Sequence, residues 1–81
     1  MSESNGIIER RPAITPSDDA AVKISVTDGI RVNTSGIVRM TDPRGNTEDT
    51  YLLGGVDYPY AVVKVYLTGT TATGIAALYY A

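Results

Sequence analysis

The chain has 81 residues, enough for one domain of marginal stability, because a chain of this size buries only about 60% of its unfolded surface. It contains no cysteine and no histidine, which excludes disulfides, thiolate or imidazole metal sites and every nucleophile that depends on a histidine base. The net charge of −2 argues against nucleic acid or an anionic membrane surface as the main ligand. We therefore expect stability to come from oligomerisation or from docking onto a partner.

Residues 1–19 differ in composition from the rest of the chain. Pro12 and Pro16 fix φ and remove backbone donors, so neither a helix nor a strand is favoured here. The segment also contains three isoleucines that can be buried against a partner: Ile7, Ile8 and Ile14. This composition predicts an extended N-terminal arm, which is either frayed or ordered against a neighbouring subunit. The first residues lack the basic and apolar segments of a secretory signal, so we expect an intracellular product.

Residues 20–81 alternate apolar and polar side chains with the period of a β-strand, and turns rich in glycine, threonine or aspartate separate the alternating segments. In chain order, the expected strands run through residues 22–26, 30–33, 37–41, 50–53, 60–68 and 75–80. The pattern predicts an all-β fold for this domain, a small single-domain β-sandwich or barrel of about five to six antiparallel strands.

The longest expected strand, residues 60–68, carries large side chains on both faces. We expect the core face to be Ala61, Val63, Val65 and Leu67, and the outward face to be Tyr60, Val62, Lys64 and Tyr66. All six tyrosines of the chain fall within its last 31 residues. Because tyrosine combines an apolar ring with a polar tip, these rings suit a surface that is buried against a partner. The alternative is that they cap a small barrel whose core lacks Phe and Trp.

The remaining candidates for chemistry are carboxylates and a glycine-rich turn. Adjacent acids such as Asp18-Asp19 and Glu48-Asp49 point to opposite sides of an extended chain, so they do not make a catalytic pair. The acidic loop 42–49 lacks the spacing of an EF-hand, and the turn 69–74 lacks the Lys-Ser/Thr of a P-loop. We therefore expect no catalytic residues, no metal and no cofactor.

Two segments resemble a known family. The C-terminal segment begins at Val65 and continues through Gly69-Thr70-Thr71-Ala72-Thr73, Ile75 and Leu78-Tyr79, in the pattern Val-x-x-x-Gly-Thr-Thr-Ala-Thr-x-Ile-x-x-Leu-Tyr. The upstream segment is Ala13-Ile14-Thr15-Pro16-Ser17-Asp18-Asp19-Ala20. In this order and spacing, they resemble the small virion proteins of tailed phages and gene transfer agents that are of the head spike-base or capsid decoration (cement) type.

The resemblance implies a non-enzymatic structural protein on the capsid exterior, which decorates or cements the head or forms the base of a head spike. It implies a virion component made in the bacterial host cytoplasm. The implied partners are the major capsid protein, other copies of the chain and, for a spike base, a fibre protein. We expect a closed homo-oligomer, a trimer or a pentamer, with no nucleic acid and no membrane as partner.

The candidate residues for an interface with the capsid or with another subunit lie in the arm and among the tyrosines. They are Ile7, Ile8, Arg10, Arg11, Ile14, Tyr58, Tyr60, Tyr66 and Tyr80. The alternative function is a small carbohydrate- or surface-binding module, such as a receptor-binding element, in which Tyr58, Tyr60 and Tyr66 stack on sugar faces.

Overall fold

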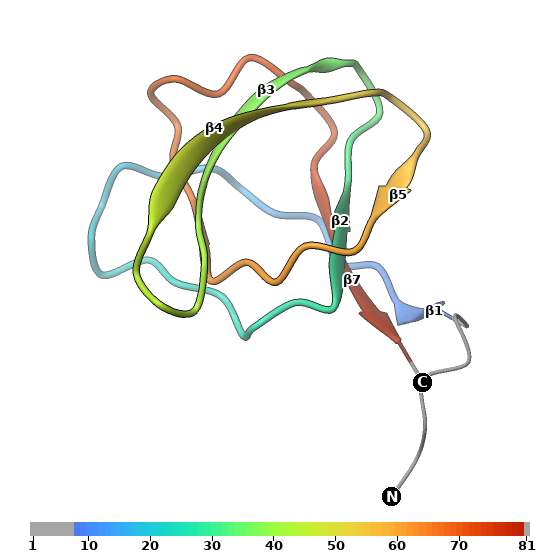
Figure 1. Ribbon diagram of the computed structural model, residues 1–81, viewed down its shortest axis with the longest axis horizontal. Helices are drawn as coiled ribbons and strands as arrows, with labels where there is room; N and C mark the ends of the chain where they lie inside the picture. The colour runs from blue at the N-terminus through green and yellow to red at the C-terminus, as the bar shows by residue number, and fades with distance from the viewer. Residues whose placement is uncertain (1–7, 81) are drawn as a thin grey trace, which may run out of the picture.

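The computed structural model describes residues 8–80, which form seven short strands in two antiparallel sheets. The strands are β1 (Ile8–Arg10), β2 (Gly29–Arg31), β3 (Gly36–Thr41), β4 (Thr47–Leu52), β5 (Asp57–Tyr58), β6 (Lys64–Val65) and β7 (Ala76–Tyr80). One sheet has the order β1-β7-β2-β5 and the other has the order β4-β3-β6 (Figure 1). The all-β class predicted from the sequence is confirmed, although several strands are shorter than expected.

The longest ladder joins β3 to β4 in a curved hairpin that lies over one side of the molecule (Figure 1). Its turn is closed by Asp42, whose carboxylate accepts the backbone N–H groups of Arg44 and Asn46 at 2.9 Å each. The bond from Asn46 is the main reason that the pKa of Asp42 lies below its ordinary value. Gly45 has a φ of 93°, which glycine adopts without steric strain. The hairpin turn therefore follows from local sequence.

The core is shared by the two sheets and consists of aliphatic side chains. Its fully buried members come from strands and from connecting segments: Ile30, Val32, Val38, Leu52, Val62 and Leu78. The chain has no Phe and no Trp, so branched aliphatic residues fill this space. The tyrosines lie around the core rather than in it, and Tyr58 and Tyr79 pack against its edge while partly exposed.

The strand predicted at residues 22–26 is wrong. Residues 22–27 lie outside any ladder, and Val22 and Val26 are 43% and 52% exposed. The carbonyl of Val22 accepts a hydrogen bond from the ammonium of Lys64, and the hydroxyl of Thr27 accepts the backbone N–H of Val62 at 3.0 Å. Side chains thus take the places that the backbone of a neighbouring strand would occupy, and a regular ladder does not form.

The long strand predicted over residues 60–68 is also wrong, because only Lys64–Val65 pair in a ladder, as β6. Val62 is 1% exposed and Leu67 is 59% exposed, which is the reverse of the faces expected from the alternation. The segment changes partners along its length, since its first half bonds to residues 24–27 and its second half bonds to β3. This change of partner interrupts the period of two on which the prediction rested.

The N-terminal segment lies along its own domain from Ile8 onward, where β1 pairs antiparallel with β7. The backbone N–H of Ile14 donates to the carbonyl of Ile75 at 2.8 Å. The side chain of Ile14 is 8% exposed and belongs to the core. Ile7 lies outside the described residues. The contact of the arm with a neighbouring subunit stays a prediction.

Candidate interface

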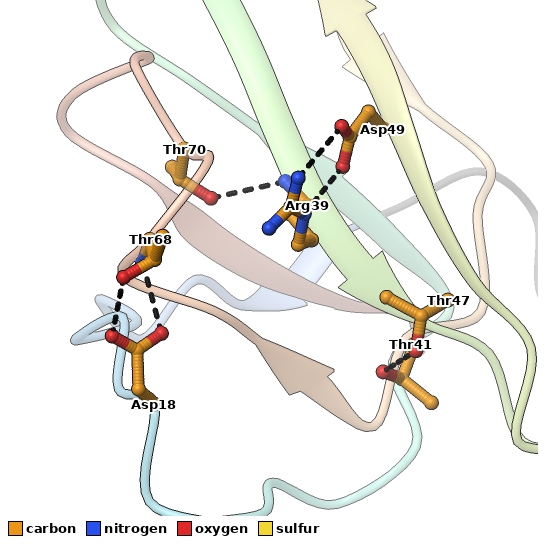
Figure 2. Close-up of polar contacts among 7 residues, drawn as sticks. All are labelled: Asp18, Arg39, Thr41, Thr47, Asp49, Thr68 and Thr70. Atoms are coloured by element: carbon orange, nitrogen blue, oxygen red, sulfur yellow. Dashed lines mark hydrogen bonds and ion pairs between the residues drawn. The ribbon is translucent and has the colours of Figure 1, made fainter.

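The threonines of the C-terminal motif close the edge of β3 that faces away from β4. Thr70 accepts the backbone N–H of Arg39 at 3.0 Å through its hydroxyl (Figure 2), and Thr71 accepts that of Ile37 at 2.8 Å in the same way. The backbone N–H of Thr71 donates to the carbonyl of Ile37 at 2.7 Å. Hydroxyl groups therefore replace backbone carbonyls along this part of β3, which gives a physical role to the paired threonines of the motif.

Two glycines allow this segment to approach β3 closely. A Cβ at Gly36 would lie 2.6 Å from the backbone nitrogen of Ala72, and a Cβ at Gly69 would lie 2.5 Å from Cζ of Arg39. Gly69 also has a φ of 93°, a conformation that L side chains rarely adopt. The motif is therefore a packing motif, and its glycine-rich turn lies against protein rather than around a ligand.

The two segments that carry the family resemblance are in contact with each other. The carboxylate of Asp18 accepts the backbone N–H of Thr68 at 2.9 Å and its hydroxyl at 2.6 Å (Figure 2). The backbone N–H of Ser17 donates to the carbonyl of Val65 at 3.0 Å. The hydroxyl bond from Thr68, followed by its N–H bond, holds the pKa of Asp18 below its ordinary value of 3.8. Residues 50 positions apart thus form one structural unit.

Lys64 anchors the turn formed by residues 17–22. Lys64 is only 4% exposed. Its ammonium donates to the carbonyl oxygens of Ser17 at 3.1 Å, Asp19 at 2.5 Å and Val22 at 3.1 Å. The ammonium also lies 4.8 Å from the centroid of the Tyr66 ring. A buried ammonium is tolerated only with such partners, so Lys64 serves the fold.

Polar cross-strand pairs cover much of the outer face of the β3–β4 hairpin (Figure 2). Thr41 and Thr47 share a hydrogen bond of 2.8 Å between their hydroxyls. Arg39 and Asp49 form a two-pronged ion pair with N–O distances of 2.8 and 3.1 Å. The hydrogen bond from Arg39 lowers the pKa of Asp49, and the same contact raises the pKa of Arg39. These pairs fix the register of the hairpin.

The third cross-strand pair on this face is apolar and open to solvent. Ile37 lies opposite Tyr51, and their exposed fractions are 38% and 61%. Leu53, just beyond β4, is 52% exposed. These residues were not among the predicted interface residues, although the sequence contains a signal for them. The alternation of the strand at 37–41 turns Val38 and Met40 inward and therefore turns Ile37 outward.

The interface residues predicted near the N-terminus lie close to the end of β7. Ile8 is half-buried opposite Tyr80, and the guanidinium of Arg10 lies 4.6 Å from the centroid of the Tyr79 ring. Arg11 is exposed. The pairing of β1 with β7 (Figure 1) thus brings two of the predicted arm residues, Ile8 and Arg10, to the end of β7 where the predicted Tyr80 lies. Their contact with another protein stays a prediction.

The other predicted tyrosines do not converge on one platform. Tyr58 and Tyr60 stack on each other, with ring centroids 5.7 Å apart and an interplanar angle of 9°. The hydroxyl of Tyr58 accepts the backbone N–H of Leu53 at 3.0 Å. Tyr66 lies instead against the ammonium of Lys64. The structure therefore brings together two of the three rings expected to stack on sugars, and these two already cover one face of each other.

Within residues 8–80, no three His, Cys, Asp or Glu side chains gather closely enough to hold a metal ion. No helix in that range is long and apolar enough to cross a membrane. The fold and the contacts described above define a small all-β domain. The threonines of its C-terminal motif hold strand β3, and apolar side chains remain exposed on the outer face of the β3–β4 hairpin.

No family model matches the sequence, and no curated protein matches it significantly. Among solved structures, the capsid of a native gene transfer agent (GTA) particle, computed with C5 symmetry, contains a chain that is 32% identical to this one. The two structures superpose with a TM-score of 0.76, over 88% of this chain and 82% of that chain. The protein therefore belongs to the same family as that capsid chain, a family of phage and gene transfer agent virion proteins.

Proposed function

We propose that the protein is a non-enzymatic structural component on the exterior of a capsid, where it decorates or cements the head or forms the base of a head spike. The observation that supports this most is the 32% identity, over most of both chains, to a chain of the GTA capsid. The local contacts agree with a structural role, because the motif residues Thr70 and Thr71 are engaged in holding β3.

We further propose a closed homo-oligomer that docks on the major capsid protein. A trimer or a pentamer would match the symmetry axes of a closed shell. The domain measures 36 × 26 × 18 Å, and β1 with the end of β7 lies far from the turn of the β3–β4 hairpin (Figure 1). Two separate ends allow a spike base to hold the capsid with one and a fibre protein with the other.

Capsids made without this protein, mixed with the purified chain and imaged by cryo-electron microscopy, test the proposal. We expect added density on the outer surface of the shell. Matched charge reversals test the arm: Arg11→Glu weakens attachment, whereas Lys23→Glu, which reverses another exposed charge, leaves it unchanged. Density on the inner surface, or folded protein that does not attach, contradicts the proposal.

A further inference from the structure

Strand β4 ends the three-stranded sheet, and in the part of the chain that the structure describes no strand pairs with its outer edge (Figure 1). The directions in which the backbone N–H and C=O groups of β3 point show which N–H and C=O groups of β4 have no partner in the sheet. The carbonyls of Ile37, Arg39 and Thr41 accept hydrogen bonds from the side away from β4. In an antiparallel ladder, successive residues of a strand bond to opposite sides. The backbone of β3 therefore bonds to β4 through residues 36, 38 and 40.

The residues of β4 opposite this outward-bonding set are Thr47, Asp49 and Tyr51. Their backbone N–H and C=O groups therefore point to the open edge, while those of residues 48, 50 and 52 are used in the ladder. A six-residue edge with this spacing is a template for another strand. Main-chain hydrogen bonds would supply affinity there, and side-chain pockets on either side would supply specificity.

Such a pocket lies under the inner face of this edge. A groove of about 540 Å³ is lined by Glu48 and Thr50 of β4, by Met40 of β3 and by Pro59 and Tyr60 of the facing segment. Because alternate side chains of an added strand point to opposite faces, every second one enters this groove. The others lie on the outer face, next to the exposed ring of Tyr51.

The charges on this edge select the kind of strand that fits. Glu48 is exposed, and among the described residues it has no ion-pair or hydrogen-bond partner, whereas Asp49 is held by Arg39. Antiparallel pairing of β4 with β4 of a second copy, centred on residue 48 or 49, would place the two Glu48 side chains opposite or diagonal to each other, which is unfavourable for like charges. A strand that carries a Lys or Arg opposite Glu48 is favoured instead.

We propose that the open edge of β4 receives an extended segment of the capsid subunit, which adds to the sheet as a fourth strand. This segment alternates, places apolar side chains in the groove beside Tyr60 and presents a basic residue to Glu48. The inference rests on the proposed function and deepens it, since it names a second surface, separate from the arm, by which the capsid holds the protein and the chemistry of the segment that binds there.

A proline at the open edge tests the strand pairing directly. Thr47 is the first residue of β4 and its N–H points to the open edge, so Thr47→Pro removes no ladder bond within the chain. We expect attachment to capsids to weaken by more than about tenfold, the cost of one lost hydrogen bond and a blocked edge. Thr47→Ala is the matched control, because it loses the same hydroxyl bond to Thr41 but keeps the N–H. Equal attachment of the two variants overturns the proposal.

Amide hydrogen exchange gives a second test that does not depend on the proline variant. In the purified protein we expect fast exchange at residues 47, 49 and 51 and slow exchange at residues 48, 50 and 52. On capsids, exchange at the first set slows by more than about tenfold, because those amides acquire partners. Protection of the first set already in the purified oligomer assigns the edge to a second copy and overturns the proposal. Attachment without protection there overturns it as well.

Glu48→Lys tests the charge of the partner segment. We expect affinity for capsids to fall by about tenfold, because two like charges then face each other across the strands. Unchanged affinity would show that the capsid segment carries no basic residue opposite Glu48. If no variant and no wild-type protein attaches to the outer surface, the proposed function itself fails, and that outcome is distinct from attachment by a different surface.

Discussion

Replacing Lys64 by methionine removes the ammonium that holds the turn at residues 17–22 and keeps an apolar stem of similar length. The ammonium donates three hydrogen bonds, to the carbonyls of Ser17, Asp19 and Val22. Together with the hydrogen bond from Ser17 to Val65, it joins the upstream segment, residues 13–20, to β6. Lys64→Met therefore tests whether one buried ammonium stabilises the contact between the turn at residues 17–22 and β6.

The size of the effect follows from these bonds. A hydrogen bond to a charged group contributes about 1.5–3 kcal/mol. The three do not add fully, because the turn is largely exposed and water can reach the released carbonyls. We expect the free energy of unfolding to fall by about 2–4 kcal/mol, from a total of about 4–12 kcal/mol for 81 residues. In a domain of this size, the Tm falls by at least about 10 °C.

Urea denaturation followed by circular dichroism measures this loss. The other lysine of the chain, Lys23, is exposed, so Lys23→Met provides a matched control that changes the same atoms at the surface. We expect that control to remain within about 0.5 kcal/mol of the wild type. If Lys64→Met is as stable as Lys23→Met, the three carbonyl contacts do not stabilise the fold and the reasoning is refuted.

Three further predictions follow from the same contacts. Thr70→Val should lower the free energy of unfolding by about 1 kcal/mol, because a β3 N–H loses its acceptor; Thr73→Val, with no side-chain hydrogen bond among the described residues, is the control in urea titrations. Val62→Asp should unfold the domain, whereas Leu67→Asp, at a position 59% exposed, should leave its circular dichroism spectrum unchanged; the opposite result would restore the simple alternation. Because the pKa of Asp18 is lower in the folded state than its ordinary value of 3.8, the ionised carboxylate stabilises the fold at pH values above 3.8. That stabilisation is lost as the pH falls through the lower pKa of the folded state. Asp18→Asn should therefore flatten the acid limb of the stability curve, and an unchanged limb would contradict this.

The parts of the fold that the sequence predicted are those determined locally. The strand expected at residues 37–41 corresponds to β3. Its side chains alternate between the core and solvent, and the turn that ends it is determined by Asp42 and Gly45 immediately after it. The strand expected at residues 75–80 likewise corresponds to β7, since Ile75 and Ala77 alternate toward the core. In both, the local pattern and the tertiary partner agree.

The parts that were missed depend on side chains replacing backbone partners. Thr27, Lys64 and Thr70 each hydrogen-bond to the backbone of a segment more than 30 positions away, and no period in the sequence records such a contact. For the same reason, residues 22–26 alternate like a strand without pairing as one, and within residues 60–68 only Lys64–Val65 pair in a ladder. The open face at Ile37 and Tyr51 was within reach of the sequence, because it follows from the register of one hairpin.

A structural role on the capsid exterior requires that the protein lie on the outer surface of the virion. Gold-labelled antibody against the folded protein, applied to intact DNA-filled particles and viewed by electron microscopy, measures that location directly. We expect labelling of the outer surface of the intact particles. Labelling that appears only after the shell is disrupted, or particles that carry none of the protein, would contradict a structural role on the capsid exterior.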